Sequence, residues 1–208
     1  MNSSKFTVFV VDDDPSVLKA LGRLVRSAGL QVELFASPED FLDRYDQNVP
    51  GCLILDVAMP NITGLEMHQT LIEKGSELPV IFLTGHGDIP MSVRAIKQGA
   101  IDFFTKPLND NELISAIQNA QKKDELARNA RAQLNELQQR LASLTPRELE
   151  VLSHVVSGKR NKQIADDLGI VEKTIKVHRS NIMEKLKVQS LADLVKLSEK
   201  LGVNSYPR

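Results

Sequence analysis

KFTVFVVDDDPSVLKALGRLVRSAGL, residues 5–30, joins an apolar strand pattern to an amphipathic helix pattern through three consecutive aspartates. The nearly continuous apolar run Phe6–Val11 is typical of a strand buried on both faces of a parallel sheet. Pro15 stands where the first turn of a helix tolerates proline, and Gly29 stands where a helix ends. The stretch therefore predicts one strand-and-helix unit of an α/β fold, with acidic side chains at the carboxyl end of its strand.

The same alternation of strand and helix patterns continues to residue 122. Strands are expected at Phe6–Val11, Val32–Phe35, Cys52–Leu55, Val80–Thr84 and Asp102–Thr105. Helices are expected at Pro15–Ala28, Pro38–Asp46, Gly64–Lys74, Ile89–Gln98 and Asp110–Lys122. Strands that alternate with helices specify a doubly wound α/β fold with a parallel five-stranded sheet, here a (βα)5 domain over residues 1–122.

Composition and charge favour two soluble domains with different partners. The 208 residues are 42% apolar and contain no apolar run near the roughly 18 residues of a membrane span. The short polar start, Met1–Lys5, is no signal peptide, and the single Cys52 cannot form an internal disulfide, so a cytoplasmic location is expected. Residues 1–124 hold 11 basic and 17 acidic side chains, whereas residues 145–208 hold 12 basic and 8 acidic ones. A basic C-terminal part behind an acidic N-terminal part indicates different binding partners.

Carboxylates follow the first and third expected strands. In an open parallel sheet the carboxyl ends of neighbouring strands meet at one edge, so we expect Asp12, Asp13 and Asp56 to converge there. Like charges packed together cost stability unless a metal ion or another cation balances them. Lys106 can neutralise part of this cluster and bind an oxyanion, and the Thr84 hydroxyl either joins it or caps its own strand. The sequence therefore predicts a site for a hard cation and an anion at this edge.

Residues 121–144 contain neither glycine nor proline and are expected to form a continuous helix, with residues 123–143 as a linker. Apolar residues recur along it at alternating intervals of three and four: Ala127, Ala130, Leu134, Leu137, Leu141 and Leu144. This spacing is that of a coiled-coil seam, although the segment is short for a coiled coil that is stable alone. The helix either pairs with a second copy in a dimer or packs on its own domains.

Four further helices are expected in residues 144–208, at Pro146–Ser157, Asn161–Leu168, Glu172–Leu186 and Ser190–Leu201. The short turn Gly169–Val171 between the second and third of these helices is typical of a helix-turn-helix unit. Basic residues on the third of these helices are by themselves explained by an ordinary solvent-exposed helix face. Beside this turn they indicate binding to DNA.

The residues at the acidic edge resemble the receiver domain of bacterial two-component response regulators. The matching motifs are Asp12-Asp13, LDVAMP at residues 55–60, Thr84 and Lys106-Pro107. The resemblance implies that a sensor histidine kinase transfers a phosphoryl group to Asp56. It also implies that Mg²⁺, which prefers oxygen ligands and keeps several waters, is held by Asp12, Asp13, Asp56 and the backbone carbonyl of Ala58.

The same resemblance implies a switch that reports the phosphoryl group. Thr84 and Lys106 would bind it, and Phe103 would follow Thr84 inward, although Phe103 is equally compatible with a core position. Phe104 is then expected on the opposite face of the sheet, packed against helices. His86, in the glycine-rich segment after Thr84, is expected to tune dephosphorylation or lie at the surface, and not to bind a metal.

Asp14 is expected to cap the helix that begins at Pro15, and not to join the metal ligands.

Residues 144–208 resemble the LuxR-type DNA-binding domain of response regulators of the FixJ and NarL group. The match lies in LTPRE at residues 144–148, NKQIA at 161–165 and TIKVHRSNI at 174–182. Helix geometry places three side chains near base edges in the major groove: Lys176, Val177 and Ser180. Others are better placed for DNA phosphates: Lys162, Lys173, Thr174, His178, Arg179 and Lys185.

The resemblances together predict a phosphorylation-activated transcription factor, which is no enzyme beyond its own phosphorylation and dephosphorylation. Expected partners are a sensor histidine kinase, double-stranded promoter DNA, a second copy of the chain and RNA polymerase, with no membrane. One alternative is a Mg²⁺-dependent phosphotransferase of the haloacid dehalogenase type. Such enzymes need a second acid two residues after the nucleophile, where Ala58 stands. Another alternative is a DNA-binding protein whose receiver serves only as a passive dimerisation module.

Overall fold

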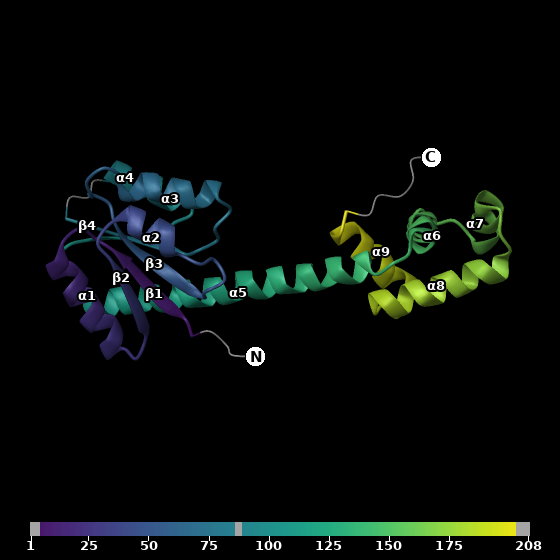
Figure 1. The fold of residues 1–208 in the computed structure, drawn as a ribbon, viewed down its shortest axis with the longest axis horizontal. Helices are drawn as coiled ribbons and strands as arrows, with labels where there is room; N and C mark the ends of the chain where they lie inside the picture. The colour runs from purple at the N-terminus through teal and green to yellow at the C-terminus, as the bar shows by residue number, and fades with distance from the viewer. Residues whose placement is uncertain (1–4, 86–88, 203–208) are drawn as a thin grey trace. The chain divides into compact units, whose positions relative to one another are not determined.

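A computed structural model describes residues 5–85 and 89–202 of the chain, so His86 lies outside the described residues. The chain divides into two compact units, Met1–Asn129 and Ala130–Arg208. The first holds the sheet with its covering helices, and the second is helical (Figure 1). None of the helices in the described ranges is long and apolar enough to cross a membrane.

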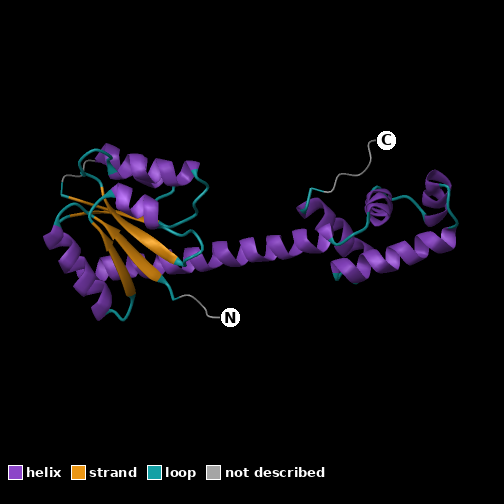
Figure 2. Cartoon of the chain, viewed as in Figure 1, coloured by secondary structure: helices purple, strands orange, loops and turns teal. Residues whose placement is uncertain are grey.

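Five parallel strands form one sheet in the first unit, as the sequence predicts (Figure 2). In spatial order they are β2 (Gln31–Phe35), β1 (Thr7–Val11), β3 (Gly51–Asp56), β4 (Val80–Thr84) and β5 (Asp102–Thr105). Val11 pairs with Leu55 across β1 and β3, so the residues that follow, Asp12 and Asp56, emerge side by side. The order of the strands therefore brings the two acidic strand ends together.

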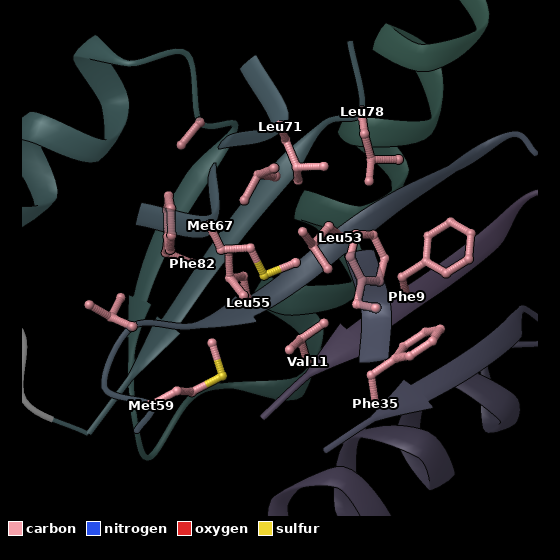
Figure 3. Close-up of a cluster of buried hydrophobic side chains, with 14 of the residues drawn as sticks. Phe9, Val11, Phe35, Leu53, Leu55, Met59, Met67, Leu71, Leu78 and Phe82 are labelled. Atoms are coloured by element: carbon pink, nitrogen blue, oxygen red, sulfur yellow. The ribbon is translucent and has the colours of Figure 1, made fainter. Parts of the chain in front are cut away.

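Helices cover both faces of this sheet. They are α1 (Pro15–Ser27), α2 (Pro38–Arg44), α3 (Gly64–Glu73), α4 (Ile89–Lys97) and α5 (Asp110–Ala142). One face packs on α2, α3 and α4 through a core that includes Phe41. Met67 and Phe82 belong to the same core (Figure 3). The other face packs on α1 and α5 through a second core that includes Leu18 and Leu113. Strands buried on both faces explain the nearly continuous apolar runs.

Local sequence explains where α1 begins and why α5 is continuous. Asp14 caps α1 by accepting a 2.7 Å hydrogen bond from the backbone N–H of Ser16, which confirms its predicted role. Helix α5 has no break near Lys122, because no glycine or proline interrupts it, and it runs unbroken to Ala142.

The second unit contains the four helices expected from the sequence, α6 (Pro146–Val156), α7 (Asn161–Leu168), α8 (Glu172–Leu186) and α9 (Leu191–Lys200). Gly169 ends α7 in the left-handed region with φ 64°, which allows the sharp turn into α8. The core of this unit includes Val151, Ile164 and Ile182. Leu144 belongs to the same core and Leu141 packs against it, so the end of the apolar seam packs on its own domain.

Candidate functional site

The acidic edge of the sheet is organised around one ammonium group. Asp12 and Asp56 are buried, with 2% and 4% of their surface exposed. The Nζ of Lys106 donates to Asp12 Oδ2 and to Asp56 Oδ1, both at 2.7 Å. Lys106 follows β5 and its backbone N–H donates to the carbonyl of Thr84 at 2.7 Å, which ties the ends of β4 and β5 together. Four strand ends thus contribute to one site.

Backbone donors hold the remaining carboxylate oxygens. Asp12 Oδ1 accepts from the N–H of Asp14 at 2.9 Å, and Asp56 Oδ2 accepts from the N–H of Ala58 at 2.7 Å. Gly64, the first residue of α3, packs so closely behind the site that a Cβ there would lie 2.1 Å from the carbonyl oxygen of Asp56. Sequence reasoning missed this role of Gly64. The feature that could have indicated it is a glycine at the start of the helix that follows the acidic loop. These contacts orient both carboxylates before any ligand binds.

The charges of this site are not balanced. Burial raises the pKa of Asp12, although hydrogen bonds from Lys106 and Asp14 and the charge of Lys106 act against that rise. Burial lowers the pKa of Lys106, but hydrogen bonds to Asp12 and Asp56 outweigh it and raise that pKa overall. One ammonium group therefore faces two buried carboxylates, and the exposed Asp13 directly follows Asp12 in the chain. The site retains negative charge that a further cation can neutralise.

The donor set fits Mg²⁺ without being a complete cage. Within the described ranges, no three acidic, histidine or cysteine side chains come together closely enough to form a metal-binding group by themselves. Mg²⁺ is usually held by one or two carboxylates together with waters and phosphate oxygens, so a complete protein cage is not required. Asp12 and Asp56 could provide these carboxylates. Asp13 directly follows Asp12, and Ala58 lies two residues after Asp56 in the chain.

Asp12→Asn is expected to raise the free energy of unfolding of the metal-free protein by about 1 kcal/mol at neutral pH, because it removes a buried charge. Burial holds the folded-state pKa of Asp12 above its ordinary value of 3.8. Below pH 3.8 the Asp12 carboxyl is protonated in both states and costs the folded protein no stability. Stability is lost as the pH rises through the folded-state pKa of Asp12 and the buried carboxyl becomes charged.

Urea unfolding across pH measures this effect: the gain should disappear below pH 3.8. A variant less stable than the wild type at neutral pH would contradict the assignment.

The two predicted switch residues, Thr84 on β4 and Phe103 on β5, lie in different environments. Thr84 is fully buried at the end of β4. Phe103 is half-buried, with its ring centroid 6.3 Å from that of Phe82, and it lines a groove of about 500 Å³ that also includes Ile89. Phe104 packs in the core on the opposite face, as predicted. Phe103 is therefore not sealed into the core and has open space on one side.

The predicted DNA-contacting side chains lie on α7 and α8 of the second unit. Five of them are exposed: Lys162, Lys173, Lys176, Val177 and Ser180. Three are half-buried: Thr174, His178 and Arg179. The Nη1 of Arg179 donates to Asn161 Oδ1 at 3.0 Å, which ties α8 to the start of α7. The exposed set leaves a basic and partly apolar surface at the beginning of α8.

Lys185, predicted to contact a DNA phosphate, has hydrogen-bond partners within its own domain. Its Nζ donates to Glu148 Oε2 at 2.7 Å and to the carbonyl of Ser143 at 3.3 Å. Glu148 is buried, and its hydrogen bonds with Lys185 and the N–H of Thr145 lower its pKa. Lys185 therefore holds α8 to the start of α6, and its ammonium group is engaged inside the domain because a buried carboxylate needs a partner.

Comparison with known proteins agrees with both halves of this architecture. Residues 8–118 match the response regulator receiver domain family, and residues 142–198 match the bacterial regulatory proteins of the LuxR family. The response regulator protein TmoT of Ectopseudomonas mendocina is 49% identical over 97% of this chain and 91% of its own length. The transcriptional regulatory protein FixJ of Bradyrhizobium diazoefficiens is 37% identical over 97% of this chain and 98% of its own.

Solved structures give the same result. The structure of response regulator StyR is similar to this chain with a TM-score of 0.85 and 48% identity, covering 94% of this chain and 99% of StyR. A strand-end acid pair bridged by lysine, a helix-turn-helix unit with an exposed basic surface, and relatives over nearly the full length agree with one another. The chain belongs to the two-component response regulators that carry a LuxR-type DNA-binding domain, and it is a transcriptional regulator.

Proposed function

We propose that Asp56 accepts a phosphoryl group from the phosphohistidine of a sensor kinase, and that this promotes dimerisation, sequence-specific DNA binding and activation of transcription through RNA polymerase. The observation that carries the proposal is the Lys106 ammonium group 2.7 Å from both Asp12 and Asp56. A buried carboxylate held in this way is available as a nucleophile, and the ammonium group beside it can neutralise an incoming phosphoryl oxygen.

The chemistry follows from these positions. A carboxylate oxygen of Asp56 attacks phosphorus and forms the P–O bond, while the P–N bond breaks and its electron pair returns to the kinase imidazole. Asp12, Asp13, Asp56 and the carbonyl of Ala58 would hold Mg²⁺, which would supply neutralisation of the charge on the phosphoryl oxygens. Lys106 pairs with one of these oxygens, and the Thr84 hydroxyl, at the neighbouring strand end, hydrogen-bonds another. The protein itself contributes positioning and electrostatic stabilisation.

Intact mass after incubation with acetyl phosphate, with Mg²⁺ or with EDTA, tests this step. The wild type should gain the mass of one phosphoryl group only with Mg²⁺, and peptide mapping should locate it on Asp56. Asp56→Asn should gain none. The control Asp14→Asn changes the exposed side chain that caps α1 and keeps the backbone N–H that donates to Asp12, so it should behave as the wild type. A wild type without uptake supports the passive dimerisation module, and steady hydrolysis of small phosphate esters supports the phosphotransferase alternative.

A surface for dimerisation is proposed on α4. Ile89, Val93 and Ile96 are 80%, 45% and 47% exposed, and their spacing places them on one face of the helix. The groove lined by Ile89 and Phe103 adjoins this face, so a change in Phe103 alters the surface that a second copy would meet. An exposed apolar stripe is costly in water unless a partner covers it, which favours pairing here.

Substitutions on α8 should separate base reading from phosphate binding. Lys176→Ala is expected to weaken binding to a cognate operator by about 1–3 kcal/mol and to relax preference at one base position. Lys173→Ala should weaken binding to all sequences alike and reduce the salt dependence by about one counterion. The operator is a duplex selected from a random library with the phosphorylated wild type, and titrations at several salt concentrations measure both effects. Equal losses on selected and unrelated duplexes for Lys176→Ala would contradict base reading.

A further inference from the structure

One guanidinium group fastens the middle of α5 to the receiver. Arg128 Nε donates to both carboxylate oxygens of Asp124 at 2.9 Å, one helical turn before it. Its other nitrogens donate to three consecutive carbonyls of the loop between α2 and β3: Nη1 to Asn48 at 3.0 Å, and Nη2 to Gln47 at 3.1 Å and Val49 at 2.7 Å. We call this arrangement the Arg128 clamp.

The clamp is built into the receiver and is no ordinary surface ion pair. Asp124 is only 5% exposed, and the backbone N–H of Gly51 also donates to its carboxylate. A Cβ at Gly51 would lie 2.3 Å from the carbonyl oxygen of Thr7, so only glycine permits this close approach of the two backbones where the loop joins β3. A planar guanidinium group can serve a carboxylate and several carbonyls at once, which an ammonium group cannot reproduce.

Little else holds this part of the helix. Around the clamp, Lys122, Glu125 and Asn129 are exposed and Leu126 is 71% exposed, while Ala127 is half-buried. A helix segment that buries so little apolar surface is marginally stable in water. The polar contacts of Asp124 and Arg128 therefore supply the main attachment of residues 123–129 to the receiver, and the first compact unit indeed extends to Asn129.

We propose that the Arg128 clamp attaches residues 123–129 to the receiver as part of its folded structure. The gain in DNA affinity on phosphorylation depends on this attachment. The second half of this inference rests on the proposed phosphorylation of Asp56. Arg128 is a positioning residue: it acts by holding the start of the linker helix to the loop at residues 47–49.

Hydrogen exchange on the full chain tests the attachment. Arg128→Met, which removes the donors but keeps an unbranched side chain, should raise exchange at amides 123–132 by about 10-fold or more, as expected when a contact worth about 1.4 kcal/mol is lost. Amides of β1 and β3 should keep their protection. Arg128→Lys should fall between Met and the wild type, and Arg131→Met, an exposed arginine one turn later on the same helix, should match the wild type.

Operator binding tests the coupling. In Arg128→Met, acetyl phosphate should still phosphorylate Asp56 to the wild-type level, but the resulting gain in affinity for the selected operator should be lost, while Arg131→Met keeps it. Unchanged exchange in Arg128→Met would overturn the attachment, and a retained affinity gain would overturn the coupling. If the wild type takes up no phosphoryl group, the proposed function fails, whereas the exchange result still decides the attachment. If Arg128→Met does not fold, Arg128→Lys decides both points by the same two measurements.

Discussion

The Lys106→Met protein is expected to lose about 3 kcal/mol of unfolding free energy at neutral pH, since removing one partner of a buried ion network leaves its charges unpaired. Asp12 and Asp56 would remain almost fully buried with no ammonium group between them. Because burial already raises the pKa of Asp12, lowering the pH should protonate Asp12 and recover part of the loss.

Mg²⁺ should also recover part of this loss, and should stabilise the variant more than the wild type, because ligand binding adds stability by mass action. Urea unfolding with and without Mg²⁺ measures both effects, and Lys122→Met, which alters an exposed lysine on α5, is the control. A Lys106→Met protein as stable as the wild type at every pH, with no larger response to Mg²⁺, would show that Lys106 does not balance the two carboxylates.

Val93→Glu is expected to keep the phosphorylated protein monomeric and to lower its affinity for a selected operator with two half-sites by about 100-fold, because two linked modules gain that much over one. Val93 lies in the centre of the exposed apolar stripe of α4, so a carboxylate there would have to be buried without a partner on pairing. Phosphoryl uptake on Asp56 should not change.

Ile72→Glu is a matched control for this variant. Ile72 lies on α3 with 41% of its surface exposed, against 45% for Val93, and is not part of the α4 stripe. Sedimentation with and without acetyl phosphate measures the oligomeric state. Equal loss of dimer in both variants, or a dimer retained in Val93→Glu, would exclude α4 as the pairing surface.

Local patterns in the sequence predict most of this fold. Largely apolar runs mark β1, β3 and β4. Helix starts such as Asp14-Pro15 and helix ends such as Gly169 carry their own backbone signals. The convergence of Asp12 and Asp56 is also predictable, because parallel strands place their carboxyl ends at one edge. Each of these features depends on neighbours in the sequence or on one general rule of sheet topology.

Contacts between distant residues are the part that the sequence leaves open. In the sequence, Lys185 looks like any other basic residue of α8. In the structure its ammonium group forms an ion pair with Glu148 of α6. The regular apolar seam of the linker helix does not reveal that Leu144 is buried in the second domain. Arg128 likewise resembles a solvent-exposed arginine, since its carbonyl partners lie about 80 positions earlier in the chain.

The central claim is that phosphorylation of Asp56 controls DNA binding by this response regulator. The most direct measurement is the affinity of the full chain for the selected operator, with and without acetyl phosphate and Mg²⁺, in the wild type and in Asp56→Asn. We predict that the phosphodonor raises the affinity of the wild type by about 10-fold or more, a usual size for coupling between two sites, and leaves Asp56→Asn unchanged. An equal gain in both proteins, or no gain in a wild type shown by mass to be phosphorylated, would contradict the claim.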